Sequence, residues 1–229
     1  VVDRSGSMDE SMRDGTREAR KMDVVTRVLG QFIEGGEGLE PREGDLLGLI
    51  AFARYADTIA PLVRDRSAVA ALARRLDTVK QRAEDGTAIG DALALAAARL
   101  RRAEEELTAR RVGRSGPESD GSEPAERDAD FTIKSKVIVL LTDGVNNAGS
   151  EDPLAVARLA AEWGIKVYVI GVGGGMRYQV IRTPLGEQRI PVGPGIDEGA
   201  LQAIADATGG RYFSAGDART LRDVYERIG

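Results

Sequence analysis

Val1-Val2-Asp3-Arg4-Ser5-Gly6-Ser7 opens the chain and decides the fold, because an apolar pair typical of a strand leads directly into one carboxylate and two hydroxyls at alternating positions. Asp85-Gly86-Thr87 and Thr142-Asp143-Gly144 are two further polar stations, each at a boundary between structural elements. Since the carboxyl ends of strands in an open α/β sheet meet at one edge, the three stations are expected to converge there. Carboxylate and hydroxyl oxygens, without His or Cys, suit a hard divalent cation such as Mg²⁺ or Mn²⁺. The predicted metal ligands are Asp3, Ser5, Ser7, Thr87 and Asp143.

Four residues beside these stations are candidates for the shell around the ligands. Gly6 lets the backbone bend between the two serines, and Gly144 directly follows the last carboxylate. Asn146 is either part of the site rim or an ordinary turn former. Asp91 has two interpretations: it complements the dipole of the helix in which it lies, or it orients a ligand hydroxyl.

Composition excludes several classes of function. The 229 residues include no histidine, which excludes a Ser-His-Asp triad and an imidazole base. They include no cysteine, which excludes a disulfide framework and a thiolate metal site. The net charge of −5 argues against nucleic-acid binding, which needs a clustered basic surface. No stretch approaches the roughly twenty apolar residues of a membrane span. Because Val1-Val2 is typical of the inside of a strand, we expect the chain to be part of a longer protein.

Apolar runs alternate with helical patterns along the chain, which predicts an α/β fold with a doubly wound, Rossmann-like, mostly parallel sheet and helices on both faces. The all-apolar run 136–142 predicts a central strand buried on both sides. Residues 58–63 predict an antiparallel edge strand beside the strand at 46–52. Helices are expected at 22–33, 67–76, 88–111, 153–163 and 197–207 and after residue 217, with Ser67, Asp197 and Asp217 as caps.

Residues 1–229 are interpreted as one domain with two additions. Residues 113–130 are rich in Ser, Gly, Pro, Glu and Asp and predict a flexible surface insertion. Residues 178–192 predict a β-hairpin excursion with a turn near Gly186. The segment 8–12, beside the first station, is interpreted as a solvated loop.

The three stations together resemble the metal-ion-dependent adhesion site (MIDAS) of von Willebrand factor A (VWA) domains. Asp3-x-Ser5-x-Ser7, Thr87 and Asp143 match its three parts in order along the chain. The segments 43–45, 86–93, 141–147 and 207–213 resemble the bacterial aerotolerance-type (Bat, BatA-like) VWA proteins in particular. The resemblance spans nearly the whole chain.

This resemblance implies a protein-binding module rather than an enzyme. In such domains the bound cation, Mg²⁺ or Mn²⁺, accepts an acidic residue of a protein partner. Bat-type VWA domains generally belong to bacterial membrane proteins and are associated with MoxR-type AAA+ ATPases, so the implied partners are such an ATPase or other VWA proteins. Membrane association is expected only through segments outside this chain, on the periplasmic or the cytoplasmic side.

Three alternatives stay open at this point. The first is a VWA subunit of a chelatase-like AAA+ machine, with the same metal site and a different partner. The second is a Mg²⁺-dependent hydrolase, although no motif places a base or a phosphate-binding arginine, and no lysine stands out as a companion to Asp3 as nucleophile. The third is a metal-free scaffold whose polar loops only cap the sheet.

Overall fold

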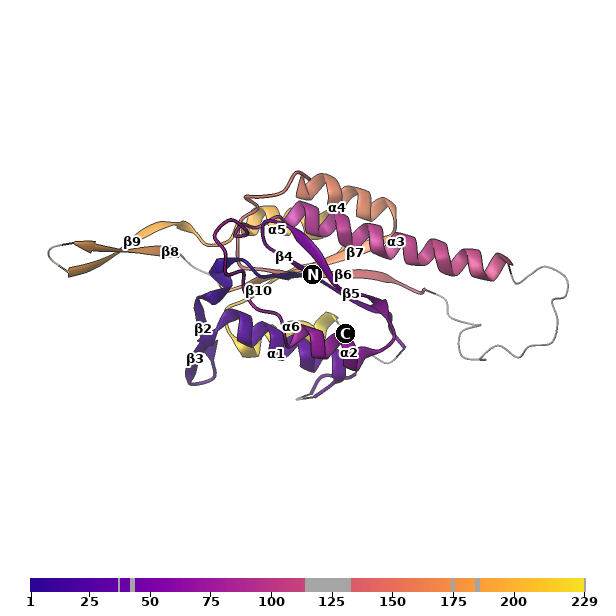
Figure 1. The fold of residues 1–229 in the computed structure, drawn as a ribbon, viewed down its shortest axis with the longest axis horizontal. Helices are drawn as coiled ribbons and strands as arrows, with labels where there is room; N and C mark the ends of the chain where they lie inside the picture. Colours follow the sequence, from indigo (N-terminus) through magenta and orange to yellow (C-terminus); the bar gives the residue numbers. More distant parts are fainter. Residues whose placement is uncertain (37, 42–43, 114–132, 174–175, 184–185, 229) are drawn as a thin grey trace.

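A computed structural model describes residues 1–36, 38–41, 44–113, 133–173, 176–183 and 186–228 (Figure 1). Its centre is a six-stranded sheet in the order β10-β7-β6-β1-β4-β5. All neighbours in this sheet are parallel except β4 and β5, so the edge strand β5 is the antiparallel one. The strands are β1 (Val2–Asp3), β4 (Leu47–Phe52), β5 (Ala56–Val63), β6 (Lys136–Thr142), β7 (Ile165–Val172) and β10 (Tyr212–Ala215).

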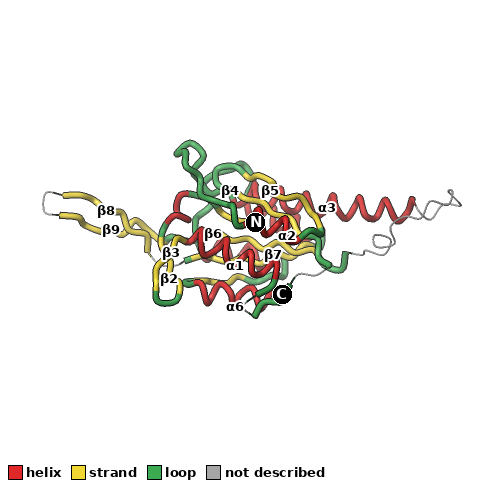
Figure 2. Tube along the Cα trace, turned by 60° about the horizontal axis from the view of Figure 1, so that its bottom comes forward, coloured by secondary structure: helices red, strands yellow, loops and turns green. Residues whose placement is uncertain are grey.

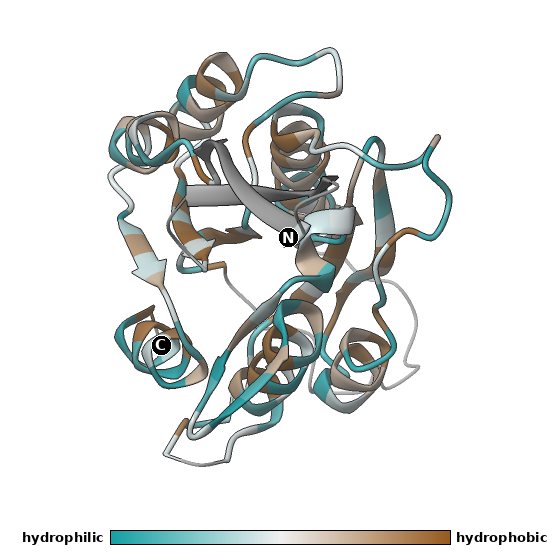
Figure 3. Ribbon diagram, turned by 90° about the vertical axis from the view of Figure 1, so that its left-hand side faces the viewer, coloured by the Kyte–Doolittle hydropathy of each residue, from teal (hydrophilic) through white to brown (hydrophobic). Residues whose placement is uncertain are grey.

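Helices cover both faces of the sheet. Three lie on one face and form one hydrophobic core with it: α1 (Lys21–Glu34), α2 (Arg66–Ala73) and α6 (Ala218–Ile228). The other three form a second core on the opposite face: α3 (Ile89–Gly113), α4 (Pro153–Glu162) and α5 (Glu198–Ala207). Figure 3 shows these two layers above and below the strands, and the buried hydrophobic residues of the helices cluster with those of the sheet. The predicted doubly wound α/β fold with one antiparallel edge strand is confirmed.

The central strands are largely buried, most completely toward their carboxyl ends, because both of their faces are covered. Val2, Leu140 and Val169 are each 0% exposed, and burial of this kind explains why the longer strands β6 and β7 are mostly apolar in sequence. Phe52 lies on the α3 side and Tyr225 of α6 on the other side, both without exposed surface.

One predicted helix cap is wrong. The side chain of Asp65, rather than that of Ser67, accepts a hydrogen bond from the backbone N–H of Ala68, and α2 begins at Arg66. Both residue types cap helices well, so sequence alone does not decide between caps two residues apart.

The interpretation of residues 8–12 as a solvated loop is also wrong. Gly6–Asp9 form a 3-10 helix, η1, and the chain continues into a hairpin of β2 (Ser11–Asp14) and β3 (Arg17–Arg20). Met8 and Met12 are 0% and 4% exposed and pack in the core beneath α1. The two methionines lie too close to polar neighbours for a periodic pattern to reveal their burial.

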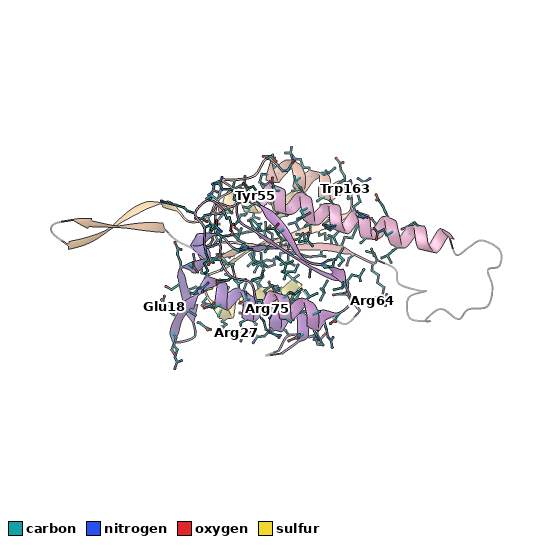
Figure 4. The ribbon with its side chains drawn as sticks, viewed as in Figure 1. Glu18, Arg27, Tyr55, Arg64, Arg75 and Trp163 are labelled. Carbon is teal, nitrogen blue, oxygen red and sulfur yellow. The ribbon has the colours of Figure 1, made fainter. Side chains whose placement is uncertain are left out.

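A second hairpin projects from the body. β8 (Met176–Thr183) pairs with β9 (Gly186–Pro194) in a separate two-stranded sheet. It follows β7 at the carboxyl end of the central sheet, whereas the last turns of α3 extend past the opposite end (Figures 1 and 2). Tyr55 and Arg64, which flank β5, mark these same two ends (Figure 4). Most of the predicted insertion at 113–130 lies outside the described residues.

Two glycines at the second position of their helices give a matched test of packing. A Cβ at Gly90 in α3 would lie 1.9 Å from the carbonyl oxygen of Glu151, whereas a Cβ at Gly199 in α5 would meet only Asp197, at 3.6 Å. We expect Gly90→Ala to lower the free energy of unfolding by about 2 kcal/mol or more, because backbone must move. Gly199→Ala should raise it by up to about 1 kcal/mol through helix propensity. Urea denaturation of both variants checks this, and equal effects would contradict the tight contact between α3 and the loop before α4.

Candidate metal centre

Two carboxylates lie at the carboxyl ends of adjacent central strands. Asp3 is the last residue of β1, and Asp143 directly follows β6. The strands are in register, since Val2 pairs with Leu141 on one side and with Ala51 of β4 on the other. Both carboxylates are buried, at 0% and 3% exposure. The fold therefore brings two like charges together in the least hydrated part of the sheet edge.

Asp3 is held by hydrogen bonds at both oxygens. The N–H of Ser5 donates to Oδ1 at 2.8 Å, and the hydroxyl of Thr142 donates to Oδ2 at 2.6 Å. Burial nevertheless raises the pKa of Asp3 to about 7, and the charge of Asp143 adds to this shift. The two hydrogen bonds act in the opposite direction without cancelling it.

The two serines of the first station line up with Asp143. The Oγ atoms of Ser5 and Ser7 are 3.0 Å apart, and Ser7 donates to Oδ1 of Asp143 at 2.6 Å. The motif does this by turning into η1 directly after Ser5, rather than by remaining extended. Three predicted ligands from opposite halves of the chain thus lie in one hydrogen-bonded row.

Thr87 of the second station faces the third station. It is buried at 3% exposure, and a Cβ on Gly144 would lie 3.0 Å from its Oγ1. The backbone of Thr87 is clamped, since its N–H donates to Oδ1 of Asn147 and its carbonyl accepts from the N–H of Asn147. Asn146 continues the clamp, because its Oδ1 accepts from the N–H of Ile89 at the start of α3. The first and third stations are therefore linked by hydrogen bonds, Thr87 packs against the residue that follows Asp143, and a Cβ at position 144 would press on Thr87.

The remaining predicted neighbours hold loops together. The N–H of Gly6 donates to Oδ1 of Asp85 at 2.8 Å, and a Cβ at Gly6 would lie 3.1 Å from the other oxygen of that carboxylate. Asp91 accepts from the N–H groups of Ser150 and Glu151, both at 2.9 Å. Asp91 is therefore bonded to the loop before α4, and these bonds are not to a hydroxyl of the centre.

Sequence reasoning missed Lys21. Its Nζ donates to Oδ2 of Asp143 at 2.7 Å and to Oε2 of Glu10 at 2.6 Å, and the residue is only 8% exposed. Burial lowers the pKa of this ammonium, but the two carboxylates outweigh burial and the net shift is upward, so Lys21 is charged. One signal was available: Lys21 is the first residue of α1, where a cation opposes the helix dipole and needs a specific partner.

The donor set fits a hard divalent cation. It offers two carboxylates and three hydroxyls. Within the described ranges no group of three or more His, Cys, Asp or Glu residues is placed to hold a metal ion, at this centre or elsewhere, so the hydroxyls would have to serve as ligands. Hydroxyls are weak, neutral ligands that suit Mg²⁺ or Mn²⁺ better than soft metals.

The pKa of Asp3 predicts an unusual pH dependence for the metal-free protein. An acid whose pKa rises from 3.8 to about 7 on folding destabilises the fold as pH rises through that window, fully so above 7. Asp3→Asn should therefore be more stable than wild type in EDTA at pH 8, by on the order of 2–4 kcal/mol, and nearly equal at pH 4. Urea denaturation at both pH values measures this. Asp152→Asn, which exchanges one good helix cap for another, is the control and should show no such trend. A wild type more stable than Asp3→Asn at pH 8 would contradict the shift.

Comparisons with known proteins agree with this architecture. The von Willebrand factor type A domain models match residues 1–146 and residues 122–227. An uncharacterised protein of Borreliella burgdorferi is 26% identical over 183 residues, which cover 78% of this chain and 44% of that protein. The chain thus spans less than half the length of this curated relative.

Solved structures share the fold. An aerotolerance-related membrane protein from Bacteroides fragilis has a TM-score of 0.63 at 23% identity, covering 99% of this chain and 94% of that one. BatB from Bacteroides thetaiotaomicron has a TM-score of 0.61 at 22% identity, covering 99% and 93%. Proximal thread matrix protein 1 from the mussel byssus, in a form with a zinc-occupied MIDAS motif, has a TM-score of 0.57 at 18% identity, covering 99% and 46%. With two family models that together extend over residues 1–227, the chain belongs to the von Willebrand factor type A domain family.

Proposed function

We propose that this domain is a metal-dependent protein-binding module rather than an enzyme. Asp3, Ser5, Ser7, Thr87 and Asp143 would hold one divalent cation, Mg²⁺ or Mn²⁺, and a protein partner would add an acidic side chain to it. The observation that carries the proposal is the convergence of three distant stations on one buried point, with Ser7 bonded to Asp143 and Thr87 packed against Gly144.

The chemistry of the donor set supports docking of an anion. A bound divalent ion supplies a concentrated positive charge with exchangeable positions, because Mg²⁺ prefers six oxygens and usually keeps some waters. The candidate centre offers two carboxylates, those of Asp3 and Asp143, and both already accept hydrogen bonds from within the protein. Such partly engaged ligands leave an ion attractive to a further anionic oxygen.

The arrangement gives less support to a hydrolase. Both oxygens of Asp3 accept hydrogen bonds and the residue is fully buried, so it is poorly placed as a nucleophile. Lys21, the buried lysine at the centre, is bonded to Asp143 rather than to Asp3. General acid-base catalysis needs a group within reach of an incoming substrate, and the chain has no histidine to serve. We therefore assign no catalytic residue.

The proposed partners follow from the likeness to Bat proteins. They are another VWA protein or a MoxR-type AAA+ ATPase that presents an acidic residue, and a chelatase-like assembly would differ only in the partner. Across the described ranges, none of the helices combines the length and apolarity that a bilayer crossing requires. Since one similar structure is that of a protein described as an aerotolerance-related membrane protein, we propose that segments outside this chain anchor it.

Metal binding is tested by thermal unfolding in EDTA, Mg²⁺ and Mn²⁺. A ligand at 1,000 times its Kd stabilises the folded state by about 4.1 kcal/mol, so millimolar metal at a micromolar site should raise Tm by roughly ten degrees. We expect this rise in the wild type and in Asp65→Asn, a helix-cap control, and no rise in Asp3→Asn. A wild type that does not respond to either ion would refute the proposed function.

Anion docking is tested with acetate as the simplest carboxylate. Mn²⁺ bound to the protein speeds the relaxation of water protons through the waters that it keeps. We expect acetate to reduce this enhancement by displacing water, while acetamide, its neutral analogue, has no effect. If acetate does not change the relaxation enhancement, the bound ion stabilises the fold and does not dock acidic residues.

A further inference from the structure

Lys21 places a permanent cation inside the shell of the candidate centre. Its ammonium lies 2.7 Å from Oδ2 of Asp143, whose side chain is fully buried, while the lysine side chain itself is 10% exposed. The other oxygen of Asp143 accepts from Ser7. Both oxygens of the Asp143 carboxylate therefore accept a hydrogen bond, and its negative charge is paired with the ammonium of Lys21.

The lysine is built into this position. Its own N–H donates to the carbonyl of Glu10 at 2.9 Å, and its Nζ donates to the Glu10 carboxylate, so main chain and side chain are held by one residue. Gly173, with a φ of +81°, leaves room for the aliphatic stem, since a Cβ there would lie 3.1 Å from Cε of Lys21. A side chain with this much support has one orientation and not several.

Solvent screens the two carboxylates that pair with Lys21, those of Glu10 and Asp143, to different extents. The side chain of Glu10 is 52% exposed, and together with Lys21 it borders a polar cleft of about 390 Å³ that opens to solvent. Asp143 has no exposed side-chain surface. Charge interactions are several times stronger where water is excluded, so the lysine acts mainly on Asp143.

We infer that Lys21 is a specificity-determining residue of the metal centre, which weakens its hold on the divalent cation and strengthens its hold on the carboxylate of a partner. Asp3 and Asp143 alone would carry a charge of −2 and would leave a divalent ion neutralised. With Lys21 the charge of the inner group is −1, and the loaded centre keeps one positive charge. This inference rests on the proposed function, because it describes how the same centre divides its affinity between metal and partner.

The test is Lys21→Met, which keeps the length of the stem and removes the charge. Binding of Mn²⁺ is measured by calorimetry at about pH 8, where free carboxyl groups are ionised, and binding of acetate by water-proton relaxation. We expect the Kd for Mn²⁺ to fall about tenfold and the Kd for acetate to rise at least threefold. If Lys21 only supports the fold, the substitution should lower Tm without lowering the Kd for Mn²⁺ and raising the Kd for acetate.

Lys136→Met is the matched control. Lys136 is also 10% exposed at its side chain and also pairs with one carboxylate, that of Glu104, but it begins β6 whereas Asp143 follows the end of that strand. The same change in net charge there should leave both Kd values within twofold of wild type. Equal effects of the two substitutions would overturn the inference in favour of a general charge effect.

Glu10→Gln decides the matter if Lys21→Met does not fold. Removal of the half-exposed carboxylate leaves the lysine to act on Asp143 alone, so Mn²⁺ should bind about threefold more weakly and acetate more tightly. Unchanged Kd values would overturn the inference while wild-type metal binding upholds the proposed function. A wild type that binds no Mn²⁺ would refute the proposed function and this inference with it.

Discussion

The rest of the structure depends on two carboxylates buried side by side at the middle of the sheet. A carboxylate is most stable when it is hydrated, and Asp3 and Asp143 are almost completely buried. The protein compensates with hydrogen-bond donors from four directions: the backbone of Ser5 and the side chains of Ser7, Lys21 and Thr142. Each of these donors needs its own support, which explains why the surrounding loops are so heavily tied to one another.

Those ties are mostly bonds from side chains to backbone. Asn146 and Asn147 fix the start of α3 to the loop after β6, and Asp85 fixes its own loop to η1. Asp91 joins the first turn of α3 to the loop before α4. Bonds of this kind set the position of the main chain itself, so the hydroxyls of Ser5, Ser7 and Thr87 are arranged before any ligand arrives. Preorganised donors lose little entropy on binding.

Much of this could be predicted from the sequence, for identifiable reasons. The α/β fold followed from buried strands that are apolar throughout, since burial on both faces removes any alternation. The helix caps at Asp197 and Asp217 were also readable, because each precedes a periodic segment and bonds to the third residue after it. These features are local, and local features are what a sequence displays directly.

The features that escaped prediction depend on distant partners. Lys21 is ordinary in its own neighbourhood and becomes meaningful only beside Asp143, 122 residues later. Met8 and Met12 are buried because α1 folds over them, which no pattern around them records. The sequence left two interpretations of Asp91 open. Its carboxylate accepts hydrogen bonds from the backbone N–H groups of residues 150 and 151, and backbone donors leave no pattern in a sequence.

The position of β1 also has a consequence for the order in which the molecule is assembled. The first strand enters the sheet between β4 and β6, and its pairing with β6 joins residues 139 apart along the chain. During synthesis Asp3 is made well before Thr142 and Asp143, which follow about 140 residues later. Until then one side of the first strand has no neighbour, and long-range pairing of this kind is slow. The candidate metal centre is therefore a late product of folding, and its completion coincides with closure of the middle of the sheet.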